Sequence, residues 1–216
     1  MSRAAVTTRT GYTRAELRSD AVVHLAGLGV VAVAVPLMVW LTAATRGDGA
    51  AVAGVAVYGA ALAAMIGASA LYNMTRGSAR AWLWRRLDHA AIYLKIAGTY
   101  TPFTLLTGQG AALTAGLWGA AVLGVAMKLV SPERFRWLAL ALYLGMGWAG
   151  VVAGQALMAA LPGGVLALML AGGITYTVGV AFHLWTRLPF HNTIWHVFVL
   201  VASLLFYAAV IALVMT

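Results

Sequence analysis

Fifty consecutive residues between Arg136 and Arg187 contain no Asp, Glu, Lys or Arg. An α-helix needs about 20 apolar residues to cross the hydrocarbon core of a bilayer, so this run is long enough for two spans. The residues LPGG at 161–164 divide the run, and proline followed by glycine favours a turn. The run therefore predicts two membrane-spanning helices joined by a short connection.

The rest of the chain repeats this pattern. The residues TGQG at 107–110 break another uncharged stretch that is too long for one helix. With the two spans above, the apolar segments at 21–45, 49–75, 88–106, 111–127 and 192–216 give seven spans. We expect an all-α membrane protein, with a seven-transmembrane helix bundle over residues 21–216. The 63% hydrophobic and 9% charged composition agrees with this class and disfavours a soluble domain.

The basic residues predict the orientation. When loops are assigned alternately to the two sides, twelve of the 14 Lys and Arg residues fall on one side. Arg46 alone falls on the other side, and Lys95 lies within a span. Cytoplasmic loops are enriched in Lys and Arg, so residues 1–20 form a basic cytoplasmic segment and the C-terminus lies outside. Topology thus accounts for the net charge of +9, and we expect membrane lipids as partners and no nucleic acid.

This topology brings scattered polar residues to the cytoplasmic ends of the spans. Ser69 and Asn73 lie four apart near the end of the second span, and Asp88 opens the third. Asn192 and His196 lie four apart at the start of the seventh span. Polar groups inside a membrane protein normally face the bundle interior, so these side chains could form one site. Asp88 also has a simpler interpretation, as a first-turn carboxylate beside basic residues.

Other ionisable residues have different interpretations. His24 and His89 lie near the membrane interface and are predicted to be anchors or surface groups, while His191 is predicted to be solvated in a basic loop. Lys95 is harder to place at the surface. It falls about 20° from Asp88 around the helix and roughly 10 Å deeper along the axis. A lysine at mid-span costs about 3 kcal/mol on insertion, so it needs a partner or water.

Three blocks carry a family resemblance: SALYN (69–73), RRLDHAAIYLKIAGTYTPF (85–103) and AGGITYTVGVAFHLWTRLPFHNTIWHVFVL (171–200). With the seven-span layout, they resemble the hemolysin III proteins, the bacterial branch of the progestin and adipoQ (adiponectin receptor-like) receptor family. The resemblance covers nearly the whole membrane region. It implies a cytoplasmic N-terminus, in agreement with the charge count, and location in the bacterial inner (plasma) membrane.

The resemblance also implies a zinc site near the cytoplasmic surface. Its three histidines would occupy positions 73, 192 and 196, with Ser69 and Asp88 beside them. This chain has Asn73 and Asn192 at two of these positions and keeps only His196. An amide oxygen is a poor zinc ligand beside imidazole. His191 could substitute only from a non-helical loop, because five helical residues place it about 140° from His196.

We therefore expect a degenerate metal site and no cofactor, zinc being what the resemblance would otherwise supply. Lys95 stands where relatives have an aliphatic residue, and we hypothesise that its charge replaces zinc in neutralising Asp88. The expected function is that of a non-catalytic hemolysin III-like membrane protein, in lipid homeostasis or, following the family name, in cytolysis.

The alternative is a zinc-dependent lipid amide hydrolase, similar to the alkaline ceramidases of the wider superfamily. Asp88 would then be the base or the group that orients water, with Ser69 in support. A retinal-binding role is disfavoured, because microbial rhodopsins carry their lysine in the last span and this chain carries Lys95 in the third.

Overall fold

The computed structural model describes residues 11–131 and 135–216. The described residues form seven helices of at least 18 residues and one short helix, α6. Their bounds are α1 Arg14–Arg46, α2 Gly49–Met74, α3 Ala81–Thr107, α4 Ala111–Val130, α5 Arg136–Ala153, α6 Gln155–Ala159, α7 Gly163–Leu184 and α8 His191–Val214.

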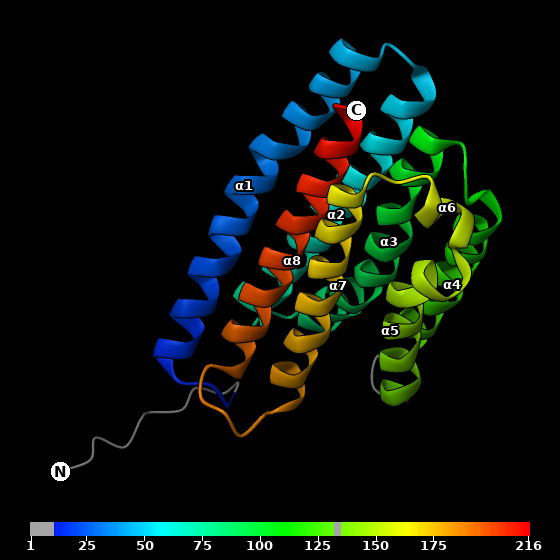
Figure 1. The fold of residues 1–216 in the computed structure, drawn as a ribbon. Coiled ribbons are helices and arrows are strands. Elements are labelled where there is room, and N and C mark those ends of the chain that lie inside the picture. The colour runs from blue at the N-terminus through cyan, green and yellow to red at the C-terminus, as the bar shows by residue number, and fades with distance from the viewer. Residues whose placement is uncertain (1–10, 132–134) are drawn as a thin grey trace.

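The long helices run side by side as a bundle (Figure 1). In this view α1 begins at the lower end, and α8 finishes at the upper end. Helix α1 packs against α2 and α8, while α3 packs against α2 and α4. The start of α1 is therefore brought next to the start of α8, from the other end of the sequence.

Local signals fix most helix ends. Thr13 and Glu16 form a reciprocal capping box that starts α1. The expected first span began at residue 21, so the helix begins seven residues earlier and includes Asp20. Residues 1–10 of the basic segment lie outside the described residues. Gly108 and Gly110 adopt positive φ in the predicted break between α3 and α4, a conformation that favours glycine.

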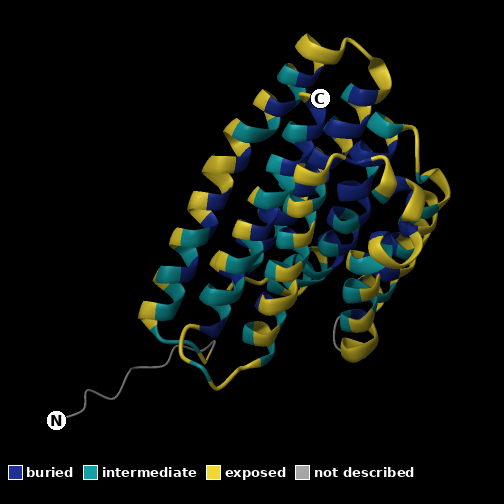
Figure 2. Ribbon diagram, viewed as in Figure 1, coloured by how far each residue is buried: buried dark blue, intermediate teal, exposed yellow. Residues whose placement is uncertain are grey.

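Six of the described helices are long and apolar enough to cross a membrane, namely α1, α2, α4, α5, α7 and α8. Helix α3 falls outside this set because its sequence includes Asp88, Lys95 and several hydroxyl residues. Figure 2 shows exposed residues along the outward faces and buried residues toward the bundle centre. Val33, Trp40 and Val152 are among the large apolar side chains that are exposed. Such an apolar exterior is that of a multi-pass membrane protein.

Candidate functional site in the bundle chamber

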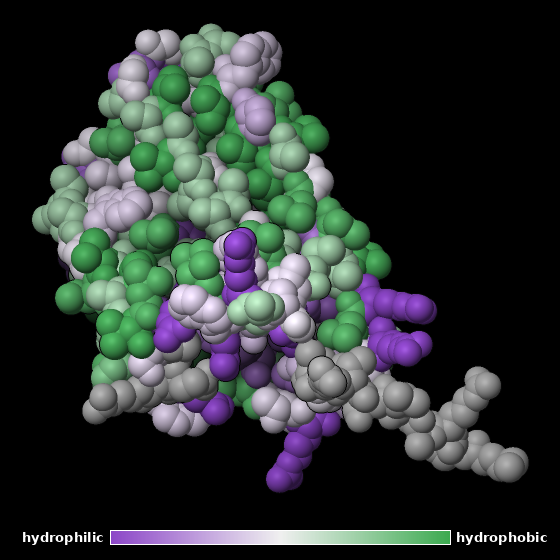
Figure 3. Space-filling model, turned by 180° about the vertical axis from the view of Figure 1, so that it is seen from behind, coloured by the Kyte–Doolittle hydropathy of each residue, from purple (hydrophilic) through white to green (hydrophobic). Residues whose placement is uncertain are grey.

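A cavity of about 690 Å³ lies inside the bundle and is lined by residues from α1, α2, α3, α4, α5, α7 and α8. We call it the chamber. It extends from Tyr12, just before the start of α1, and Arg76, just after the end of α2, to Trp148 within α5 and Phe206 within α8. Figure 3 shows hydrophilic side chains gathered around a recess at the lower end of the molecule, with hydrophobic surface above it. The chamber therefore joins a polar end to an apolar interior.

The polar residues singled out in the sequence line this chamber: Ser69, Asn73, Asp88, Lys95, His191, Asn192 and His196. They come from α2, α3 and α8, and the packing of these helices places them around one space. The structure thus assembles the residues into one cavity, while their chemical roles depend on the individual contacts described below.

The two asparagines at the expected ligand positions are engaged in hydrogen bonds. Asn73 accepts from the Arg76 guanidinium through its Oδ1 atom, and its Nδ2 donates to the Ser69 carbonyl over 2.9 Å. Asn192 Nδ2 donates to Asp20 Oδ2 over 3.2 Å. Both amides therefore orient neighbouring polar groups.

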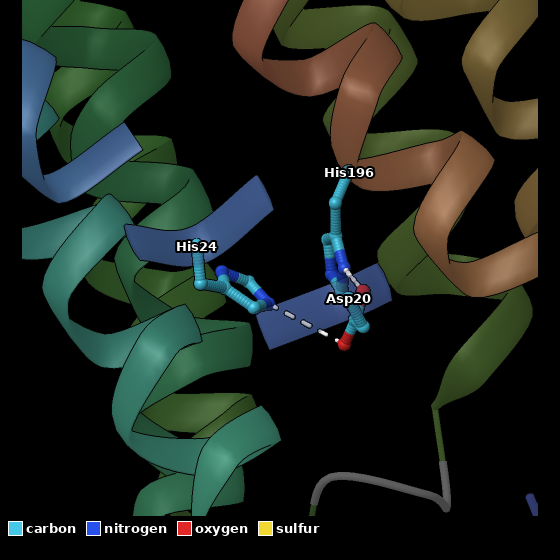
Figure 4. Close-up of side chains that lie close together, drawn as sticks. All are labelled: Asp20, His24 and His196. Carbon is cyan, nitrogen blue, oxygen red and sulfur yellow. Dashed lines mark hydrogen bonds and ion pairs between the residues drawn. The ribbon is translucent and has the colours of Figure 1, made fainter. Parts of the chain in front are cut away.

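A second polar cluster joins Asp20 and His24 of α1 to His196 of α8 (Figure 4). Asp20 and His24 are four residues apart, so both lie on the same face of α1. His196 Nδ1 lies 2.6 Å from Asp20 Oδ1, and it donates because an ionised carboxylate only accepts. His24 Nε2 lies 3.6 Å from Asp20 Oδ2, and the two imidazole rings are 4.4 Å apart between centroids. All three residues are buried.

These contacts correct two expectations from the sequence. His24 is buried against Asp20 and His196 and is not an interfacial anchor. His191 is buried as the first residue of α8, stacked on Tyr12 at 6.0 Å between ring centroids, and is not solvated. Among the described residues, the one group of three or more acidic or histidine side chains able to converge on a metal ion is Asp20, His24 and His196. His191 does not belong to it.

Asp88 and Lys95 have different surroundings in the chamber wall. Asp88 lines the chamber together with Ser69, His24 and His196. The Lys95 ammonium lies over the rings of Tyr176 and Phe206, at 4.4 and 4.7 Å from their centroids. No carboxylate of the described residues lies within ion-pair distance of it. The direct contacts of Lys95 are therefore aromatic, of the cation–π type.

Comparison with known proteins agrees with this architecture. The family model described as "Haemolysin-III related" matches residues 16–207. Hemolysin-3 of Bacillus cereus is 36% identical over 211 residues, which cover 95% of this chain and 94% of that protein. The Hemolysin-3 homolog of Bacillus subtilis (strain 168) is 36% identical over 197 residues, covering 89% and 91% respectively. By family match and by relatedness over nearly its full length, the chain belongs to the hemolysin III family of multi-pass membrane proteins.

Proposed function

We propose that this protein binds an anionic, single-chain membrane lipid in the chamber and so takes part in membrane lipid homeostasis. The volume of about 690 Å³ lies within the roughly 300–1,000 Å³ of small-molecule binding sites. Ile66, Ile96 and Leu144 supply part of an apolar wall, along which an acyl chain would lie. This combination of an apolar interior and a polar end is complementary to an amphipathic lipid.

The charge of the chamber wall carries the proposal. Its formally charged residues among those described are five cations, Arg76, Arg85, Lys95, Lys128 and Arg136, and one carboxylate, Asp88. A cavity lined mainly by one sign of charge attracts ligands of the opposite sign. A carboxylate or phosphate head group therefore fits this chamber better than a neutral or cationic one.

In the proposed arrangement α3 also crosses the membrane, which brings the number of spans to seven, and its polar side chains face the chamber and not the lipid. The N-terminus would lie in the cytoplasm and the C-terminus outside, following the distribution of Lys and Arg. The polar end of the chamber would then face the cytoplasmic side of the bacterial inner membrane. A lipid could enter with its head group at that surface.

The experiment compares two glycine substitutions on α5. A Cβ atom added at Gly147 or at Gly145 would meet no atom within 4 Å, but only Gly147 lines the chamber. Gly147→Leu should therefore reduce chamber volume and weaken binding of a fluorescent fatty acid at least tenfold. The matched Gly145→Leu variant should bind like the native protein. Mass spectrometry of co-purified lipids should show the same contrast, and equal binding by both variants would refute a chamber-bound lipid.

Lipid amide hydrolysis is a second candidate function. It is favoured by Asp88, which lines the chamber together with Ser69 and two histidines, His24 and His196. Zinc at the expected family positions does not fit, because Asn73 and Asn192 offer amides that are already hydrogen-bonded. Release of free fatty acid from a ceramide-like lipid, abolished by Asp88→Asn, would support hydrolysis. Binding of the fatty acid without any such release would support the lipid-binding role alone.

A further inference from the structure

The cluster of Asp20, His24 and His196 has the composition of a metal site. It presents two imidazole nitrogens and one carboxylate oxygen, all within 4.8 Å of one another, from two packed helices. Donors around a tetrahedral ion at about 2.0–2.2 Å lie roughly 3.3–3.6 Å apart. The Asp20–His24 separation of 3.6 Å already matches this spacing, and the 2.6 Å Asp20–His196 hydrogen bond would lengthen as the ion replaced its proton.

A second observation points to a missing ligand. His24 is 4% exposed, and its Nε2 atom has no hydrogen-bond partner among the described residues. This nitrogen faces the Asp20 carboxylate from a distance too long for a hydrogen bond (Figure 4). Buried imidazole nitrogens normally bond to a protein group, water or metal. A cation between Asp20, His24 and His196 would satisfy it.

The contacts of Asp20 and the access to the cluster also fit a metal site. Asn192 donates to Asp20 Oδ2 over 3.2 Å, the kind of contact that orients a ligating carboxylate. A second carboxylate, Asp88, lines the same chamber as both histidines of the cluster. Because His24 and His196 also line the chamber, an ion could reach them through it.

We propose that Asp20, His24 and His196 bind one divalent first-row transition-metal ion. Two imidazoles and one carboxylate select this class over calcium and magnesium, which prefer oxygen ligands. Three protein ligands leave at least one coordination position open. The site uses α1 and α8, in contrast to the expected set at positions 73, 192 and 196, and shares only His196 with it. The proposal of a metal site does not rest on the proposed lipid binding.

The test is metal binding by the full chain, purified in detergent on a tag without histidine. After chelator treatment, the native protein is titrated with Zn²⁺ and separately with Co²⁺. Metal content is measured by elemental mass spectrometry, and the visible absorption of Co²⁺ reports nitrogen and oxygen coordination. We expect one equivalent of metal in the native protein, with affinity reduced at least about tenfold by Asp20→Asn and by His24→Gln.

His191→Gln is the matched control. Like His24, His191 is buried, lines the chamber and has a ring nitrogen without a hydrogen-bond partner among the described residues. It does not belong to the cluster of Asp20, His24 and His196. Its substitution should leave metal affinity unchanged. Thermal melts of the metal-free variants establish that they are folded. Failure of the native protein to take up either ion would overturn the proposal, as would an equal loss in His24→Gln and His191→Gln. No lipid ligand is added, so the outcome is separable from that of the chamber experiment.

Discussion

Asp20 and Lys95 are 4% and 3% exposed, yet they are surrounded by opposite kinds of group. Polar groups surround Asp20: His196 and Asn192 donate hydrogen bonds to it, and His24 lies beside it. Lys95 has two aromatic faces over its ammonium and no ion pair in the described part of the chain. One buried charge is therefore compensated by directional contacts, and the other is compensated only by ring faces.

The two residues therefore differ in what their charge can do. The carboxylate of Asp20 is already engaged by protein donors, whereas the ammonium of Lys95 can still bind a ligand. His196 and Asn192 of α8 both donate hydrogen bonds to Asp20 of α1, so removing the carboxylate leaves two donors between the helices without this partner. Ring faces offer no strong hydrogen-bond acceptor, so the N–H groups of the ammonium can still donate to an anion. The comparison thus predicts that Asp20 contributes mainly to stability and metal binding, and Lys95 mainly to ligand binding.

The largest effect on stability should follow from Asp20→Ala. It removes the group on which two histidines and an asparagine converge, so we expect a loss of about 3 kcal/mol in the free energy of unfolding. The measurement is denaturant unfolding of the metal-free protein in detergent. Asp48→Ala is the control, because Asp48 is the exposed N-cap of α2 and its loss should cost about 1 kcal/mol. Equal losses in the two variants would contradict a structural role for Asp20.

Lys95→Met should have a smaller effect on stability and a measurable effect on binding. Methionine keeps the apolar volume beside Tyr176 and Phe206, so the free energy of unfolding should change by less than about 1 kcal/mol. Affinity for a fatty acid should fall about tenfold, or roughly 1.4 kcal/mol, in a fluorescence displacement assay. A neutral lipid alcohol should bind equally well to both proteins.

A large loss of stability with unchanged fatty-acid affinity would instead support the hypothesis that Lys95 neutralises Asp88. In that case Lys95→Met would leave Asp88 uncompensated and destabilise the protein by about 3 kcal/mol, with fatty-acid affinity preserved.

The all-α class and the main helix breaks were predictable because their causes are local. The glycines at 108 and 110 and the LPGG turn interrupt apolar runs that are otherwise continuous, and the breaks fall there in the structure. The start of α1 differs from the prediction, although Thr13 and Glu16 have the spacing of a capping box. The first long uncharged run begins only at residue 21, so apolar content alone does not indicate a helix start at Arg14.

The candidate site was harder to predict from the sequence. Asp20 and His24 have a spacing typical of ligands on one helix face, a signal that apolar counting passed over when Asp20 was assigned to the basic segment. His196 lies 176 residues after Asp20, and no local pattern indicates that α1 and α8 are neighbours. The resemblance directed attention to positions 73 and 192, where this chain has amides.

The smallest effect should come from Asn192→Ala. Asn192 donates to Asp20 over 3.2 Å and to Asn73 over 3.5 Å, so its removal should cost about 1 kcal/mol of unfolding free energy. The matched control is Thr193→Ala, which removes the 2.9 Å hydrogen bond to Ser19 between the same two helices. Each variant is combined with Asp20→Ala in a double-mutant cycle, with unfolding measured for the single and double variants.

If Asn192 acts through Asp20, the Asn192 cycle should give an interaction energy above about 0.5 kcal/mol, because the two residues share one hydrogen bond. The Thr193 cycle should be additive, because neither Thr193 nor Ser19 has a hydrogen bond to Asp20. Additivity in both cycles would mean that Asp20 is held by its histidines alone. The hydrogen bond from Asn192 would then contribute nothing to the stabilisation of Asp20. The difference between Asp20 and Lys95 would depend only on the contacts of Asp20 with the two imidazoles.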